Sequence, residues 1–304
     1  MNGMMRTACA AIGAALCLLA AAPALADAQQ DVAWCNAAAG QGVSLAHRIA
    51  GCTARIEAGG KDEISVFMAS INRGNAYSEQ GDYPQALADF QHALRILPDN
   101  PTGLLNSGNT YMRMGRYDQA VRFYTRLIGV APKDASAFAS RCHAYNRMGR
   151  NAEALKDCDR AVALDPKDAA ALLTRGEVHY DLDQLLAAYD DYSRVIALDP
   201  KNAAAFENRG NINFMAERFA HAIEDYDRAI ALDPNAAAAY YYRGSSYEGR
   251  GLPAKAIADY DRAIRLKPDY ADAFAARGKA KLKAGDTAGG NADLARAKEL
   301  GAKP

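Results

Sequence analysis

The sequence lacks an excess of charge of either sign, because Lys and Arg number 36 and Asp and Glu also number 36. A nucleic-acid-binding protein usually carries a clear basic excess, so this balance argues against that class of protein. Beyond its N-terminus the chain also lacks an apolar run as long as a membrane-spanning helix requires. We therefore expect no nucleic-acid partner, and no integral membrane span once the N-terminus has been processed.

The common signatures of catalysis are missing as well. The chain has no G-x-x-x-x-G-K-[ST], G-x-S-x-G, H-E-x-x-H or G-x-G-x-x-G motif. A metal site needs converging ligands, but the histidines are scattered over the chain, at His47, His92, His143, His179 and His221. The sequence therefore predicts no enzymatic activity, no metal and no cofactor.

Residues 1–26 have the pattern of a secretory signal peptide. Arg6 is followed by an apolar stretch over 8–22, and small residues at Ala24 and Ala26 suit a signal peptidase. We expect cleavage after Ala26 and a periplasmic or secreted protein; an uncleaved anchor helix is the alternative. Four cysteines would then remain in an oxidising compartment, where disulfides form.

A repeat of 34 residues organises the rest of the chain. Proline recurs at this interval, at positions 98, 132, 166, 200, 234 and 268. Within each repeat, positions 8 and 20 are mostly Gly or Ala and position 24 is mostly aromatic, a spacing that predicts two closely packed helices, A over positions 2–15 and B over 18–31. The repeats begin at residues 67, 101, 135, 169, 203, 237 and 271.

This pattern resembles the tetratricopeptide repeat family, whose signature is a 34-residue helix pair with small, aromatic and Pro residues at fixed offsets. The resemblance implies an all-α, right-handed α-solenoid of about seven repeats over residues 67–304. We expect residues 27–66 to form an N-terminal helical cap, and the degenerate last register, 271–304, to form a polar C-terminal cap. The sequence departs from the family at position 7, which is mostly Arg instead of Leu.

The arginine at position 7 has a matching column at position 23, which is mostly Asp. The one repeat without the arginine has Ser107, and it is also the one without the aspartate, with Phe123. This covariation predicts an ion pair between helices A and B of the same repeat, although both columns could simply be solvated. The expected pairs are Arg73–Asp89, Arg141–Asp157, Arg175–Asp191, Arg209–Asp225, Arg243–Asp259 and Arg277–Asp293.

The four remaining cysteines fit this frame as two pairs. Cys142 and Cys158 occupy positions 8 and 24 of one repeat, which face each other across helices A and B. Cys35 and Cys52 have a similar separation in the N-terminal cap. We predict the disulfides Cys35–Cys52 and Cys142–Cys158; buried free thiols are the alternative for the second pair.

The family resemblance implies a concave face lined by helix A at positions 2, 5, 6, 9, 12 and 13. Asparagine, which offers both a donor and an acceptor, recurs there at Asn72, Asn75, Asn106, Asn109, Asn208 and Asn211. Such a row could hold the backbone of an extended peptide, as it does in some family members. The alternative is that N-x-G-N is merely a common variant of helix A.

The same face changes character along the array. Early repeats present Arg113, His143 and Arg147, whereas later repeats are acidic and aromatic. We expect the candidate contacts in the later repeats to be Tyr180, Glu207, Phe214, Tyr241 and Tyr242. Exposed tyrosines are typical interface anchors, but Tyr241 and Tyr242 could instead pack against a neighbouring repeat.

These observations predict an exported scaffold that binds a protein or peptide partner, an extended peptide or a helix, in its concave groove. Two alternatives remain. One is an accessory protein of the cell envelope that contacts glycan through aromatic side chains. The other is a homo-oligomer whose groove is filled by its own neighbour.

Overall fold

The computed structural model describes residues 27–38, 40–59 and 62–302. The predicted signal peptide, residues 1–26, lies outside them. Within the described residues the regular secondary structure is helical throughout, as expected for an all-α protein. In this part of the chain we find no helix long and apolar enough to cross a bilayer.

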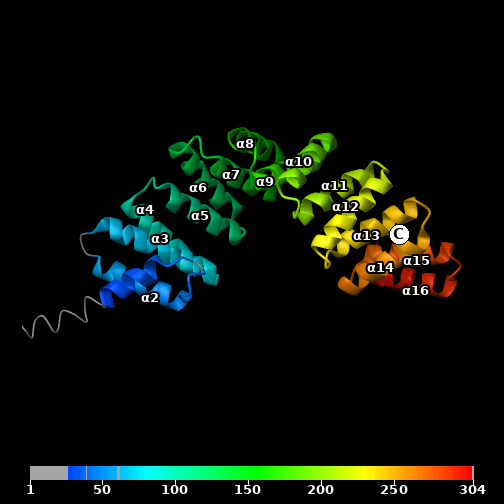
Figure 1. Ribbon diagram of the computed structural model, residues 1–304, viewed down its shortest axis with the longest axis horizontal. Coiled ribbons are helices and arrows are strands. Elements are labelled where there is room, and N and C mark those ends of the chain that lie inside the picture. Colours follow the sequence, from blue (N-terminus) through cyan, green and yellow to red (C-terminus); the bar gives the residue numbers. More distant parts are fainter. Residues whose placement is uncertain (1–26, 39, 60–61, 303–304) are drawn as a thin grey trace, which may run out of the picture. The chain divides into compact units, whose positions relative to one another are not determined.

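The chain divides into two compact units of successive antiparallel helices, the first ending at Met148 and the second beginning at Gly149. Figure 1 follows each unit from helix to helix. The first unit contains a helix at 27–36, α2 (Leu45–Ala58), α3 (Glu63–Gln80), α4 (Tyr83–Ile96), α5 (Pro101–Arg113), α6 (Tyr117–Val130) and α7 (Ala135–Arg147). The second contains α8 (Asn151–Leu164), α9 (Ala169–Asp181), α10 (Leu185–Leu198), α11 (Ala203–Met215), α12 (Phe219–Leu232), α13 (Ala237–Gly249), α14 (Pro253–Leu266), α15 (Ala271–Lys283) and α16 (Thr287–Glu299).

The helices follow the register read from the sequence. Helices α5, α7, α9, α11, α13 and α15 begin on the first residues of their repeats. Helix α3 begins earlier, at Glu63, because the Asp62 side chain caps it by accepting a hydrogen bond from the Ser65 amide at 3.1 Å. Neighbouring helices A contact each other within the units: α3 contacts α5 and α5 contacts α7 in the first, and α11 contacts α13 and α13 contacts α15 in the second.

Close packing of glycine against an aromatic ring holds helices A and B together. A Cβ atom at Gly176 would lie 2.6 Å from the ring of Tyr192, and one at Gly210 would lie 2.9 Å from that of Tyr226. The ring of Phe90 lies on Gly74 in the same way. Position 8 therefore carries glycine opposite an aromatic residue, because the ring occupies the space that a side chain at position 8 would need.

The predicted Arg–Asp pairs are confirmed wherever both residues lie in one unit. Each arginine donates two hydrogen bonds of 2.6–3.1 Å to a buried aspartate, in Arg73–Asp89, Arg175–Asp191, Arg209–Asp225, Arg243–Asp259 and Arg277–Asp293. Arg141 and Asp157 belong to different units, so their pairing stays a prediction. In the exceptional repeat, the Ser107 hydroxyl donates to the carbonyl of Gly103 at 2.7 Å instead.

The same arginines also reach helix B of the preceding repeat, which the sequence analysis did not anticipate. Nη1 of Arg175 bonds Asp159 at 3.1 Å, and Nη1 of Arg243 bonds Asp227 at 2.6 Å. In Arg209 this third bond goes to the Ser193 hydroxyl at 3.3 Å. One side chain therefore joins three helices, and helix pairs are linked to their neighbours as well as internally.

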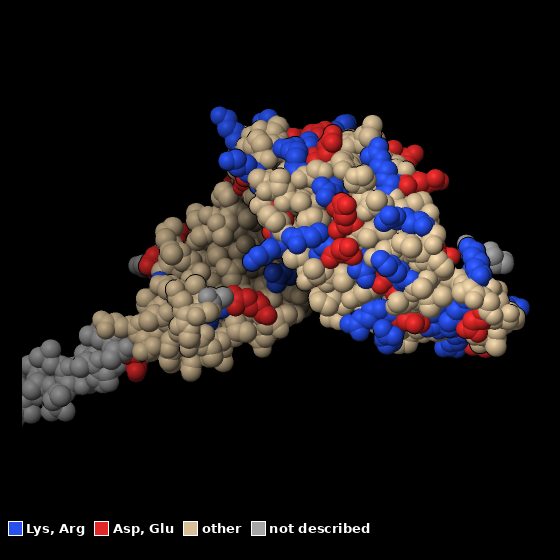
Figure 2. Space-filling view, turned by 45° about the vertical axis from the view of Figure 1, so that its right-hand side comes forward, with Lys and Arg blue, Asp and Glu red and all other residues tan. Residues whose placement is uncertain are grey.

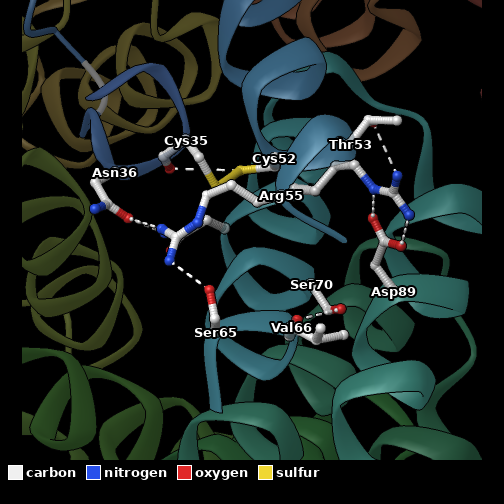
Figure 3. Close-up of a disulfide and its surroundings, with 11 residues drawn as sticks. Cys35, Asn36, Cys52, Thr53, Arg55, Ser65, Val66, Ser70 and Asp89 are labelled. Atoms are coloured by element: carbon white, nitrogen blue, oxygen red, sulfur yellow. Dashed lines mark hydrogen bonds and ion pairs between the residues drawn. A yellow bond between two sulfur atoms is a disulfide. The ribbon is translucent and has the colours of Figure 1, made fainter. Parts of the chain in front are cut away.

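The N-terminal cap is closed by a disulfide between Cys35 and Cys52, as predicted (Figure 3). Arg55, on α2, ties the cap to α3 by donating to Asn36 Oδ1 at 3.1 Å and to Ser65 Oγ at 2.7 Å. Cys142 and Cys158 are each buried, but they lie in different units and their disulfide stays a prediction.

Candidate functional site

A groove of about 400 Å³ lies along α3 and α5 in the first unit, and we call it the asparagine groove. Its head is formed by residues 36–38 of the disulfide-closed cap and by Arg48. Arg48 forms a bidentate ion pair with Glu79, at 2.6 and 3.0 Å. The groove is lined mainly by polar side chains, including Asn36, Asn72, Asn75, Ser78, Asn106, Asn109, Thr110 and Arg113.

The asparagines of this groove bond to one another and to the core. Asn72 donates to Asn36 at 3.4 Å, and Asn106 donates to Asn75 at 2.8 Å. Asn109 accepts a 2.7 Å hydrogen bond from the hydroxyl of the buried Tyr124. The carbonyl oxygens of Asn75 and Asn109 are thus engaged, which leaves their amide NH₂ groups to donate. These side chains therefore support the fold and also form a hydrogen-bonded row along the groove, and their role in holding a peptide stays a prediction.

A second cavity of about 490 Å³, the basic groove, continues along α5 and α7. It shares Asn109 and Arg113 with the asparagine groove, so the two adjoin at these side chains. The structure brings Arg113, His143 and Arg147 together here, as the sequence suggested. Partial burial, followed by the positive charge of Arg147, lowers the pKa of His143.

In the second unit, the candidate residues spread over the face formed by α9, α11 and α13. Asn208, Asn211 and Tyr180 line a small pocket of about 170 Å³ together with Glu177, Asp181 and Tyr192. Asn211 accepts from the Tyr226 hydroxyl at 2.8 Å, which repeats the arrangement of Asn109 and Tyr124. The Tyr180 hydroxyl donates to Met215 Sδ at 3.4 Å, and both residues are exposed.

The remaining candidates form an aromatic cluster. Phe214 packs against the ring of Tyr242 at 5.8 Å, and Tyr241 lies 5.0 Å from Tyr242 in a T-shaped arrangement. Tyr241 also contacts Tyr260 and Tyr270, at 5.8 and 5.1 Å. Tyr241 and Tyr242 are half-buried, so the packing foreseen as the alternative exists, and part of each ring still faces solvent.

Several residues of these sites escaped the sequence analysis. Asn36 and Arg48 lie in the cap, outside the 34-residue register, and no periodicity could assign them to the groove. Tyr270 is at position 34, which is not an inner-face position. Burial, followed by the charge of Asp272, raises the pKa of Tyr241; Asp272 is at position 2, which belongs to the inner-face set, so it could have been found.

Charge on the outer surface is mixed. Figure 2 shows Lys and Arg intermingled with Asp and Glu on the face turned to the viewer, in keeping with the zero formal net charge. Any selection of ligands by charge would therefore depend on local sites such as the basic groove.

Two family models, both described as tetratricopeptide repeat, match the chain. One matches residues 77–140, and the other matches 141–203, 173–237 and 208–271. Together they cover most of the array. The chain belongs to the tetratricopeptide repeat family. A comparison with curated proteins finds no significant match.

Solved tetratricopeptide repeat structures have the same fold. A protein from Parabacteroides merdae is 22% identical with a TM-score of 0.59, over 77% of this chain and 93% of its own. MamA is 26% identical with a TM-score of 0.50, over 57% of this chain and 94% of its own. YrrB, described as having an unusual peptide-binding site, is 21% identical with a TM-score of 0.53, over 60% and 95%.

Proposed function

We propose that this protein is an exported scaffold that binds an extended peptide segment of a partner protein along the adjoining asparagine and basic grooves of its first unit. The observation that supports this best is the joining of the asparagine groove and the basic groove at Asn109 and Arg113. Volumes of about 400 and 490 Å³ fall within the usual range for ligand sites. Membership of a repeat family that presents concave binding surfaces agrees with this function.

The chemistry of the groove favours a peptide backbone. An extended chain presents unpaired carbonyl oxygens at regular intervals. The side-chain amides of Asn75 and Asn109 can donate to such carbonyls, because their own oxygens already accept hydrogen bonds from Asn106 and Tyr124. Donors held in place by internal hydrogen bonds cost less ordering entropy on binding. The ligand we propose is therefore recognised partly through its main chain.

Export is the second part of the proposal. The Cys35–Cys52 disulfide supports it, because structural disulfides persist in oxidising compartments and are rare in the cytosol. The signal-like pattern at 1–26 gives the mechanism of export. Sequencing the N-terminus of the protein from cells should give Asp27 as the first residue. A protein that retains residues 1–26 would contradict processing at Ala26.

The binding proposal is tested by selecting twelve-residue peptides from a displayed random library on the folded protein. The affinity of a selected peptide is then compared between Asn109→Leu and Tyr124→Phe. Both variants remove the same 2.7 Å hydrogen bond, but only Asn109→Leu removes the groove amide. We expect Asn109→Leu to weaken binding about 10-fold, roughly one charge-neutral hydrogen bond, and Tyr124→Phe to weaken it far less.

Two results would refute the proposed function. One is the absence of enriched peptides on a protein that is shown to be folded. The other is an equal loss of affinity in the two variants, since Asn109 would then act only through the core. Light scattering on the same sample checks whether the groove is instead occupied by a second copy of the chain.

A further inference from the structure

The second unit carries an aromatic and acidic surface of a different kind, which we call the tyrosine face. It consists of Tyr241 and Tyr242 on α13, Tyr270 in the turn before α15, Glu207 on α11 and Asp272 at the start of α15. The Tyr241 ring lies 5.0 Å from that of Tyr242 and 5.1 Å from that of Tyr270. All three rings are half-buried, so they are held in place by packing and still offer surface to a ligand.

Carboxylates act electrostatically on the rings of this face. Burial, followed by the nearby Asp233, raises the pKa of Glu207. Burial is also the main cause of the raised pKa values of Tyr242 and Tyr270, with contributions from Asp272 and Glu207. Both carboxylates thus interact electrostatically with the ring cluster, whose geometry is given by the ring contacts of Tyr241 with Tyr242 and Tyr270.

Two lysines lie near this face, one paired with Glu248 and one over the ring of Tyr270. Lys283 pairs with Glu248 at 3.4 Å, and Glu248 also accepts from the Tyr260 hydroxyl at 2.8 Å. Among the described residues, Glu207 and Asp272 make no ion pair. Lys267 Nζ lies 4.8 Å from the centroid of the Tyr270 ring, which shows that a ring of this cluster accepts a cation over its surface.

We propose that the tyrosine face binds a lysine or arginine side chain of a peptide segment of the partner protein, with Glu207 and Asp272 as counter-charges and the tyrosine rings as the cation–π surface. The inference rests on the proposed function, because it takes the ligand to be a peptide. A cation gains from the ring quadrupoles and from both carboxylates. An acidic side chain would be repelled by the same groups, and a purely apolar one would leave the half-buried Glu207 without a counter-ion.

The proposal predicts the composition of selected peptides. Peptides enriched from the random library on the wild-type protein should contain Lys or Arg more often than the starting library. In one such peptide, replacing the basic residue by norleucine should weaken binding about 10-fold, the size of one partly desolvated cation–π contact with a counter-charge. The preference should shrink as salt is raised.

Variants of the protein locate the effect. In Glu207→Gln/Asp272→Asn the affinities for the basic peptide and its norleucine analogue should become nearly equal. The matched control is Glu224→Gln/Asp190→Asn, which removes two exposed carboxylates from α12 and α10 and should keep the 10-fold preference. Thermal unfolding of both double variants verifies that they are folded.

The outcomes separate the two proposals. Enriched peptides without a basic preference, or a preference that survives in Glu207→Gln/Asp272→Asn, would overturn the role of the tyrosine face and leave the groove proposal standing. A library that yields no binding peptide at all would overturn both. A basic preference that is lost only in the Glu207/Asp272 variant is the result that we expect.

Discussion

Arg209 and Asp225 form a bidentate ion pair, so the effects of replacing them on the free energy of unfolding should be strongly coupled. Asp225 is 4% exposed and accepts hydrogen bonds from Arg209 at 2.6 and 3.1 Å and from Asn213 at 2.9 Å. Replacing Arg209 by Leu would leave a buried carboxylate with only the asparagine as a donor. Removing one partner of a buried pair costs about 3–5 kcal/mol.

The expected cost of removing Arg209 is smaller than this range, because its side chain is 22% exposed and water can partly replace the guanidinium as a donor to Asp225. We therefore expect Arg209→Leu to lower the free energy of unfolding by about 2–3 kcal/mol. Asp225→Leu should cost less, about 1–2 kcal/mol, because the guanidinium can turn toward solvent and still bond Ser193. The double variant should cost about 1–2 kcal/mol less than the sum of the single ones.

Equilibrium unfolding in urea measures all four proteins, and comparable slopes are needed for the free energies to be compared. A coupling energy below about 0.5 kcal/mol would refute the reasoning, since contacting residues in one network usually exceed that value. It would mean that the two columns covary for a reason other than their mutual hydrogen bonds. Arg95→Leu and Glu224→Leu, at two exposed positions in different units, form a control cycle that should give no coupling.

Three further predictions concern single sites. Gly176→Ala should destabilise the protein by about 1–3 kcal/mol, because its Cβ would lie 2.6 Å from the facing tyrosine ring; Gly129→Ala, with no atom within 4 Å, should be neutral or stabilising. Replacing Cys35 and Cys52 by Ser should lower the free energy of unfolding, measured in urea, by about 3 kcal/mol. It should also weaken the binding of peptides at the head of the asparagine groove. Burial opposes the ionisation of Asp293, but hydrogen bonds from two cations outweigh it and lower the pKa of this carboxyl group. The contribution of Asp293 to the free energy of unfolding should therefore be present above about pH 4 and be lost as the pH falls further. Urea midpoints of Asp293→Asn and of the wild type, measured at pH 6 and at pH 3, would test this.

The sequence predicted the helices well because their signal is repeated. One glycine opposite one tyrosine would be weak evidence, but the same offset recurs from Gly74 and Phe90 to Gly244 and Tyr260. The ion pair within each repeat could also be predicted from the sequence, because the one repeat that lacks the arginine at position 7, with Ser107, also lacks the aspartate at position 23. The third hydrogen bond of each arginine could not be predicted, because its partner is Asp, Ser or Thr in different repeats. No single residue type therefore recurs at that position of the repeat.

The candidate site was harder to predict, because the same side chains serve both the core and the groove. Asn109 and Asn211 are inner-face residues, yet each accepts a hydrogen bond from a tyrosine whose ring is buried between helices. A buried hydroxyl without a partner would be costly, so folding alone can favour these asparagines. In each residue the side-chain oxygen serves the fold, while Asn109 also lines the asparagine groove and Asn211 the small pocket of the second unit. A sequence column cannot separate the two uses. Variants on the two sides of one hydrogen bond, at Asn109 and at Tyr124, can separate them.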